Sequence, residues 1–219
     1  MNWDLIWSSF GPLITGAVTG TIPLTLASFA FGLVLALVVA LMRLSPNWLL
    51  SGIGRFYVSV IRGTPLLVQL FVIFFGLPSI GIRLDPWPSA IIAFSLNVGG
   101  YAAEIIRAAI LSVPKGQWEA GHTIGMSRPQ ALVRIILPQA ARVSVPPLSN
   151  TFISLVKDTS LASLILVTEL FRNAQQIAAF SQEFMALYVQ AALVYWVICL
   201  VLSTAQSAAE KRLDRYVAH

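Results

Sequence analysis

Charge and cysteine are both scarce in this sequence of 219 residues. Only 11% of the residues are charged, whereas soluble domains carry roughly 25%. So little charge cannot cover a water-facing surface, and we therefore expect most of the exterior to face lipid. The hydrophobic fraction of 57% and the mean hydropathy of +0.80 agree with that expectation. Cys199 is the only cysteine, which excludes an intrachain disulfide and a CxxC site.

Several binding and catalytic motifs are absent as well. The sequence has no GxxxxGK[ST] phosphate loop, so it cannot bind ATP in that manner, and it has no hydrolase-type nucleophile elbow. No second histidine or cysteine stands at metal-ligand spacing from His122 or His219. The net charge of +5 is not gathered in a block or stripe, which disfavours nucleic acid. We expect no metal, no bound cofactor and no enzyme activity.

Five apolar segments are long enough, or nearly so, to cross a bilayer core, which needs about 20 helical residues. They cover residues 20–42, 56–77, 87–111, 143–167 and 184–208. No internal repeat is evident, so the sequence predicts a single all-α membrane domain over residues 1–219. The N-terminus carries Asp4 and lacks the basic region of a cleaved signal peptide, so we expect the first segment to stay in the membrane.

The basic residues predict the orientation of these segments. They concentrate in the first and third connections and after the fifth segment, namely at Arg43, Arg55, Lys115, Arg128, Arg134, Arg142, Lys211, Arg212 and Arg215. The opposite connections hold only Arg83 and Arg172. By the positive-inside rule, the N-terminus lies outside and the C-terminus in the cytoplasm.

The third connection, about residues 112–142, is long and has helical composition. Residues 117–126 and 129–137 predict two short helices at the cytoplasmic face, with Gly125 as the turn between them and Pro138 as a stop. Small residues at Ala120 and Gly121 would let a helix enter a partner's groove closely. The alternative is an ordinary amphipathic helix at the membrane surface.

Residues 119–138, EAGHTIGMSRPQALVRIILP, resemble the EAA loop of the permease subunits of ABC importers. The matching positions are Glu119, Ala120, Gly121, Gly125, Ile135, Leu137 and Pro138. Gly121 departs from the pattern, which usually has a second alanine, but it is still small. The resemblance implies that this loop couples the chain to a separate ATPase and that His122 contacts it.

The resemblance extends over nearly the whole chain, to the polar amino acid permeases. Their second helix resembles Arg62-Gly63-Thr64-Pro65 with Gln69. Their third helix resembles Ser95-Leu96-Asn97 with Tyr101-Ala102-Ala103-Glu104. Their fourth helix resembles Lys157-Asp158-Thr159-Ser160-Leu161, which follows Pro146-Pro147. Within that family the chain looks closest to L-cystine permeases. The resemblance implies a type I ABC importer permease fold in a bacterial inner membrane.

The implied partners are two ATPase subunits that use ATP and Mg²⁺, a second permease copy or a homologue, and an extracytoplasmic solute-binding protein. The implied mechanism is alternating access. Two other hypotheses remain at this point. An ion-driven carrier would use Asp158 or Glu104 as its ion site, but the chain is short and lacks an inverted repeat. A non-transporting scaffold would leave the charges in mid-membrane without a purpose.

Those charges are Lys157 and Asp158 in the fourth segment, where a charge costs about 2.5–3.5 kcal/mol on insertion scales. Adjacent residues do not face each other on a helix, so each needs its own partner or an aqueous cavity. One cation and one anion would suit the ammonium and carboxylate of an amino acid, with Thr159 and Ser160 beside them. The alternative is a structural network, for example Lys157 with Glu104 or Asp158 with a hydroxyl.

Polar residues of the second and third segments complete the expected site. Gln69 and Asn97 lie near mid-membrane, where they could line the same cavity or join helices. An Arg62–Glu104 pair would satisfy both groups and could form an inner gate, or belong to a structural network. We expect Arg107 to reach the interface instead. Pro146-Pro147 should break the start of the fourth segment and open backbone toward the path.

Overall fold

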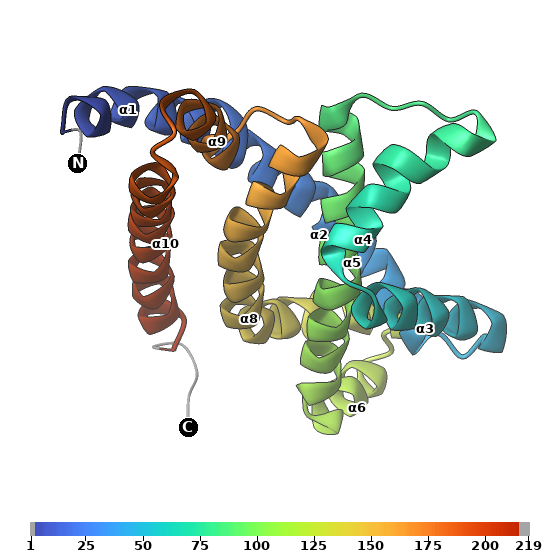
Figure 1. Cartoon of the computed structure of the whole chain (residues 1–219). Helices are drawn as coiled ribbons and strands as arrows, with labels where there is room; N and C mark the ends of the chain where they lie inside the picture. Colours follow the sequence, from blue (N-terminus) through green and yellow to red (C-terminus); the bar gives the residue numbers. More distant parts are fainter. Residues whose placement is uncertain (1–2, 215–219) are drawn as a thin grey trace.

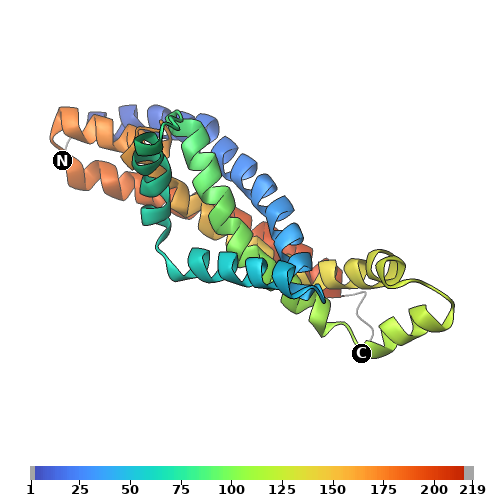
Figure 2. The ribbon, with the colours of Figure 1, turned by 90° about the vertical axis from the view of Figure 1, so that its right-hand side faces the viewer.

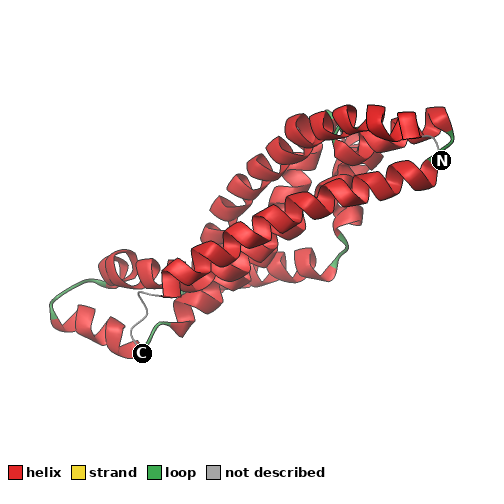
Figure 3. Ribbon diagram, turned by 90° about the vertical axis from the view of Figure 1, so that its left-hand side faces the viewer, coloured by secondary structure: helices red, strands yellow, loops and turns green. Residues whose placement is uncertain are grey.

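The computed structural model describes residues 3–214, and every regular element in that range is a helix (Figure 3). Three helices are long and apolar enough to cross a membrane, and up to five spans result if each of two bent helix pairs counts as one. This confirms the expected all-α membrane architecture. Arg215 and His219 lie outside the described residues.

The first span is longer than predicted. α1 (Trp3–Gly16), a π-helical turn (Ala17–Thr21) and α2 (Ile22–Leu44) form one helix of 42 residues, whereas the apolar run predicted 20–42. Polar side chains interrupt the apolar run before residue 20 without breaking the helix. Ser9 and Thr19 donate their hydroxyl protons to carbonyls four residues earlier, at 2.5 and 2.8 Å, so the helix itself satisfies them.

The second span, predicted as one apolar helix over residues 56–77, is a bent pair of helices. α3 (Trp48–Gly63) meets the next helical stretch, Leu66–Ile80, at an angle of 106°. That stretch consists of α4 (Leu66–Phe71), a π-helical turn (Val72–Gly76) and a 3₁₀ turn (Leu77–Ile80). Pro65 disfavours helical backbone at the residue before it, and Thr64 is extended, with φ −123° and ψ 145°.

The third span agrees with its prediction, and the third connection agrees in part. α5 (Pro86–Ser112) covers the predicted 87–111. α6 (Lys115–Thr123) and the next helix, formed by α7 (Arg128–Ala131) and a π-helical turn (Leu132–Ile136), are the two expected short helices. Gly125 lies between them with φ +80°, in the left-handed region that glycine adopts without strain.

The prolines of the fourth span do not act as predicted. The helix that begins at Arg128 continues into α8 (Leu137–Asp158), so Pro138 is not a stop and Pro146-Pro147 lie inside the helix. The carbonyls that lose a helical donor to these two prolines belong to Arg142 and Val143, which are both exposed.

The backbone breaks later, where a 3₁₀ turn (Thr159–Ile165) ends at Leu166 with φ 68°. α9 (Leu170–Ser181) follows with a bend of 48°, and α10 (Phe184–Asp214) is the last span. The break therefore comes after the charged pair Lys157 and Asp158 rather than before it.

α5 forms the centre of the bundle and packs closely against its neighbours through small residues. A Cβ added at Gly32 of α2 would lie 2.6 Å from Val98 Cγ1, and one added at Gly100 would lie 2.5 Å from Ile61 Cγ2. Such close backbone approach is how membrane helices gain packing contacts where lipid removes the usual hydrophobic drive. The completely buried Phe94 fills the core beside them.

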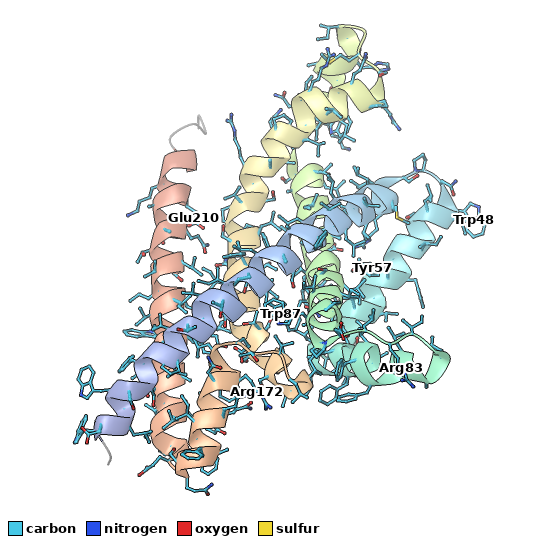
Figure 4. All side chains as sticks on the ribbon, turned by 90° about the horizontal axis from the view of Figure 1, so that it is seen from above. Trp48, Tyr57, Arg83, Trp87, Arg172 and Glu210 are labelled. Atoms are coloured by element: carbon cyan, nitrogen blue, oxygen red, sulfur yellow. The ribbon has the colours of Figure 1, made fainter. Side chains whose placement is uncertain are left out.

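The molecule is elongated. Figures 1 and 2 show α6 and the helix after it projecting from one end, near the C-terminal end of α10, with the N-terminus and α9 at the other end. In Figure 4, Arg83 and Arg172 lie toward the end with α9, whereas Trp48 and Glu210 lie nearer the end with α6. The basic third connection and the weakly basic opposite connections are thus at opposite ends of the bundle.

Candidate functional site

An open cleft of about 410 Å³ lies among three elements of the bundle, the α3–α4 junction, α5 and α8. Figure 1 labels these helices. The junction contributes Thr64, Pro65 and Leu66. The polar side chains of the two helices are those of Asn97, Tyr101, Asn150, Thr151, Ser154 and Asp158. The volume falls within the range of about 300–1,000 Å³ that small-molecule sites occupy. Non-helical backbone at the junction lines this cavity, as irregular backbone at membrane depth is expected to do.

The bend at Thr64-Pro65 is held by two amide side chains. Gln69 donates its Nε2 protons to the carbonyls of Ile61 and Thr64, at 2.8 and 3.1 Å, and to Thr64 Oγ1 at 2.9 Å. Asn97 Nδ2 in turn donates to Gln69 Oε1 at 3.0 Å. Gln69 therefore supplies the donors that the broken helix loses, and Asn97 holds Gln69 in place.

Of these two amides, only Asn97 lines the cleft. The sequence left open whether Gln69 and Asn97 line a cavity or join helices. The geometry gives Asn97 both roles and gives Gln69 the joining one.

Asp158 and its predicted companions separate in the structure. Asp158 lines the cleft, and within the described residues it makes no hydrogen bond or ion pair. Lys157 is exposed and does not line the cleft. Thr159 is buried and donates to Val156 O at 2.7 Å, while Ser160 donates to the carbonyl of Lys157 at 2.7 Å.

The cleft residues on α8 share a spacing that the sequence already contains. Asn150, Ser154 and Asp158 are four residues apart, so they lie on one face of the helix. This polar stripe within an apolar segment was a signal that the sequence reasoning did not use. It pointed to Asp158 without Lys157.

The predicted Arg62–Glu104 pair does not form. Glu104 binds Arg43 of α2, and its other oxygen accepts from Arg107 Nε at 3.0 Å. These three side chains are only 16 to 28% exposed. Arg107 thus pairs with Glu104 three residues earlier on α5, a pairing that the sequence did not predict. The guanidinium of Arg62 lies over the ring of Tyr101, 5.5 Å from its centroid, which is cation–π geometry.

The residues of the loop motif divide into an inner and an outer set. Gly121 is buried, and a Cβ added there would lie 3.2 Å from both Ala131 Cβ and Ile135 Cδ1. Gly121 thus packs against the following helix of its own chain, and its small size serves that contact rather than a groove in a partner. Ile135 and Leu137 are half-buried in the same hairpin. Exposed motif residues are Glu119, Ala120, His122, Gly125 and Pro138.

A buried carboxylate, Glu169, escaped the sequence reasoning. It is 0% exposed and accepts hydrogen bonds from the backbone N–H groups of Phe171 and Arg172, at 2.9 and 2.6 Å, and from Tyr195 Oη at 2.7 Å. It is the N-cap of α9, a position that Ser, Thr, Asp or Asn usually hold, so its place in the sequence did not indicate a cap. The described part of the chain contains no group of three or more metal-binding side chains.

Known proteins match almost the full length of the chain. Residues 28–215 match the family described as binding-protein-dependent transport system inner membrane component. The chain is 62% identical over 217 residues to the L-cystine transport system permease protein TcyB of Bacillus subtilis, which covers 99% of this chain and 93% of that protein. It is 38% identical over 214 residues to the glutamine transport system permease protein GlnP of Escherichia coli, with 97% of each covered.

A solved structure is similar over the same length. A chain from the crystal structure of an amino acid ABC transporter with histidines superimposes with a TM-score of 0.90 at 33% identity. The superposition covers 97% of this chain and 99% of that one.

Proposed function

This chain belongs to the family of binding-protein-dependent transport system inner membrane components, and from that premise we propose that it is the permease of an ATP-driven L-cystine importer. Its fold is that of the type I ABC importer permeases, and it is a multi-pass inner membrane protein that works as an amino acid permease without its own ATPase. The observation that carries the choice of cystine is the identity of 62% over 217 residues to an L-cystine permease.

We place the substrate in the cleft between α4, α5 and α8. Asp158 has an unpaired carboxylate there, which suits the ammonium of an amino acid, and Asn97 lies across the same cleft. Arg62 and Lys157 are both exposed and neither lines the cleft, but the guanidinium of Arg62 lies over Tyr101, which does line it, so we assign the substrate carboxylate to Arg62 in place of Lys157. Thr159 and Ser160 bond to backbone and take no substrate contact in this proposal.

The partners follow from the family and from the exposed surfaces. Two ATPase subunits, which use ATP and Mg²⁺, would dock at the hairpin of α6 and α7 through Glu119, Ala120 and His122. A second permease copy or a homologue would pair with this chain, as the family implies. A solute-binding protein would deliver the amino acid at the opposite end.

We propose that the N-terminus lies outside and the C-terminal end of α10 in the cytoplasm. The basic third connection supports this orientation, because it lies at the end of the bundle that also holds the C-terminal end of α10 (Figure 2).

Neither rival hypothesis fits the family. An ion-driven carrier or a non-transporting scaffold would not share nearly its whole length with transport system permeases. Glu104, which a carrier could have used as an ion site, is already paired with two arginines.

Uptake by the reconstituted importer tests the proposal. The chain is purified with its ATPase and solute-binding protein, placed in vesicles containing ATP, and given radiolabelled L-cystine, L-glutamine or L-histidine. We expect ATP-dependent uptake of cystine well above that of the other two. Uptake of glutamine or histidine in preference to cystine would refute the assignment of substrate. Uptake that is driven by an ion gradient and does not need ATP would refute the mechanism.

A further inference from the structure

Glu169 makes contacts that its role as a helix cap does not explain. Backbone N–H groups at the start of α9 bind both of its oxygens, and the hydroxyls of Tyr195 and Thr21 bind Oε2 at 2.7 and 3.3 Å. The four donors belong to α9, to α10 and to the first long helix. No cation among the described residues pairs with it. A buried carboxylate is costly unless hydrogen bonds satisfy it, so these three elements are held together around one charge.

The first helix fixes the backbone of Glu169 from the other side. A Cβ added at Gly20 would lie 2.5 Å from both Glu169 Cα and Thr168 O, and one added at Gly16 would lie 2.5 Å from Asn173 Nδ2. Two glycines spaced by four residues thus allow the helix to touch the main chain of the bend directly. Glu169 therefore has little room to move.

Tyr195 connects this buried joint to the cleft. Its hydroxyl donates to Glu169 at 2.7 Å, and Glu169 closes the segment that begins with Thr159. Thr159 is completely buried and begins the 3₁₀ turn directly after Asp158, the unpaired acid of the cleft. The turn ends at Leu166 in the left-handed region, which a leucine adopts only where surrounding contacts hold it.

We propose that Glu169 and Tyr195 are positioning residues, which anchor the far end of the segment containing the 3₁₀ turn Thr159–Ile165 and thereby fix Asp158 in the cleft. Neither side chain lines the cleft, so both act through the turn that follows Asp158. The effect on transport rests on the proposed function, in which Asp158 binds the ammonium of the substrate. The effect on the turn itself does not depend on it.

Tyr195→Phe is the variant of choice, because it removes one hydroxyl and leaves Glu169 its backbone donors. Tyr188→Phe is the matched control. Tyr188 lies two turns earlier on α10, its ring contacts Phe171 and Phe184, and its hydroxyl makes no hydrogen bond within the described residues. Both variants are studied in the full complex with ATPase and solute-binding protein.

Three quantities are measured, namely hydrogen exchange of residues 159–165 without substrate, the KM and kcat of uptake, and the melting temperature. For Tyr195→Phe we expect faster exchange in the turn and a KM raised by about three- to tenfold, as the loss of one hydrogen bond gives, with a smaller change in kcat. Tyr188→Phe should leave all three at wild-type values.

Unchanged hydrogen exchange in Tyr195→Phe would overturn the inference. The inference would also fail if Tyr195→Phe speeds exchange without raising KM, although Asp158→Asn does raise KM. A lower melting temperature and a lower kcat with an unchanged KM would mean that the contacts of Glu169 only stabilise the fold, and this result would also overturn the inference. If Asp158→Asn leaves KM unchanged while Tyr195→Phe speeds exchange, the proposed substrate site fails and the control of the turn by Tyr195 stands.

Discussion

Replacing Glu104 by glutamine should destabilise the bundle measurably. Glu104 joins α2 to α5 by binding Arg43 and Arg107, and all three side chains are 16 to 28% exposed. Both arginines find their ion pair in this one carboxylate. Glu104→Gln keeps the shape and removes the charge that holds these cations together.

The magnitude lies between two limits. Removing one partner of a buried ion pair costs about 3–5 kcal/mol, whereas an exposed pair contributes about 0–1 kcal/mol. For these largely covered side chains we expect a loss of about 2–3 kcal/mol. At about 2–4 °C per kcal/mol for a chain of this size, the melting temperature should fall by about 4–12 °C.

The assay is thermal unfolding of the purified chain in lipid nanodiscs, with two comparison variants. Arg107→Gln removes only a pair within one helix, for which about 0.2–0.5 kcal/mol is usual, so its melting temperature should fall by less than about 2 °C. Arg62→Gln should leave the Glu104 cluster intact, because Arg62 lies over Tyr101. A Glu104→Gln variant within 2 °C of wild type would refute the reasoning, taking about 2 °C as the least shift that 1 kcal/mol gives.

Three further outcomes are expected. Asp158→Asn should weaken apparent substrate affinity by roughly ten- to a hundredfold, since charge-assisted hydrogen bonds contribute about 1.5–3 kcal/mol, without a large change in melting temperature. Gly125→Ala should reduce co-purification of the ATPase, because an alanine strains the turn at φ +80°. Gly116→Ala is the control, because an added Cβ meets no atom within 4 Å at either position and Gly116 does not have a positive φ. Equal effects of the two variants would argue against strain. Single cysteines at the exposed Ser79 and Lys115 should be labelled from outside and only after permeabilisation, respectively, and the reverse would invert the topology.

Composition and local pattern were enough to predict the membrane class and the hairpin of the third connection. These features depend on properties that the chain carries locally. A low charged fraction excludes a water-facing surface, an apolar run of sufficient length predicts a span, and Gly125 permits a turn wherever it is placed. The motif from Glu119 to Pro138 was recognisable for the same reason, since it is defined by residue types at fixed spacing along the chain.

Proline was misleading because its effect depends on its surroundings. The 106° bend at Thr64-Pro65 is stable because Gln69 supplies donors for the carbonyls left free there, and Asn97 donates to Gln69 Oε1 and holds it in place. Pro146-Pro147 stay inside α8, where the affected carbonyls belong to exposed residues. The sequence shows that a donor is missing, but not which side chain can replace it.

The pairing of charges was decided by the tertiary structure alone. Arg43, 61 residues before Glu104, reaches it because glycines let α2, α3 and α5 pack closely, and Arg62 is drawn to Tyr101 instead. Glu169 likewise connects three helices only because folding brings Gly20 and Tyr195, which are distant in the sequence, into contact with it. The sequence determines which groups need partners in lipid, because an unsatisfied charge is costly there, whereas the packing of helices determines which partners they find.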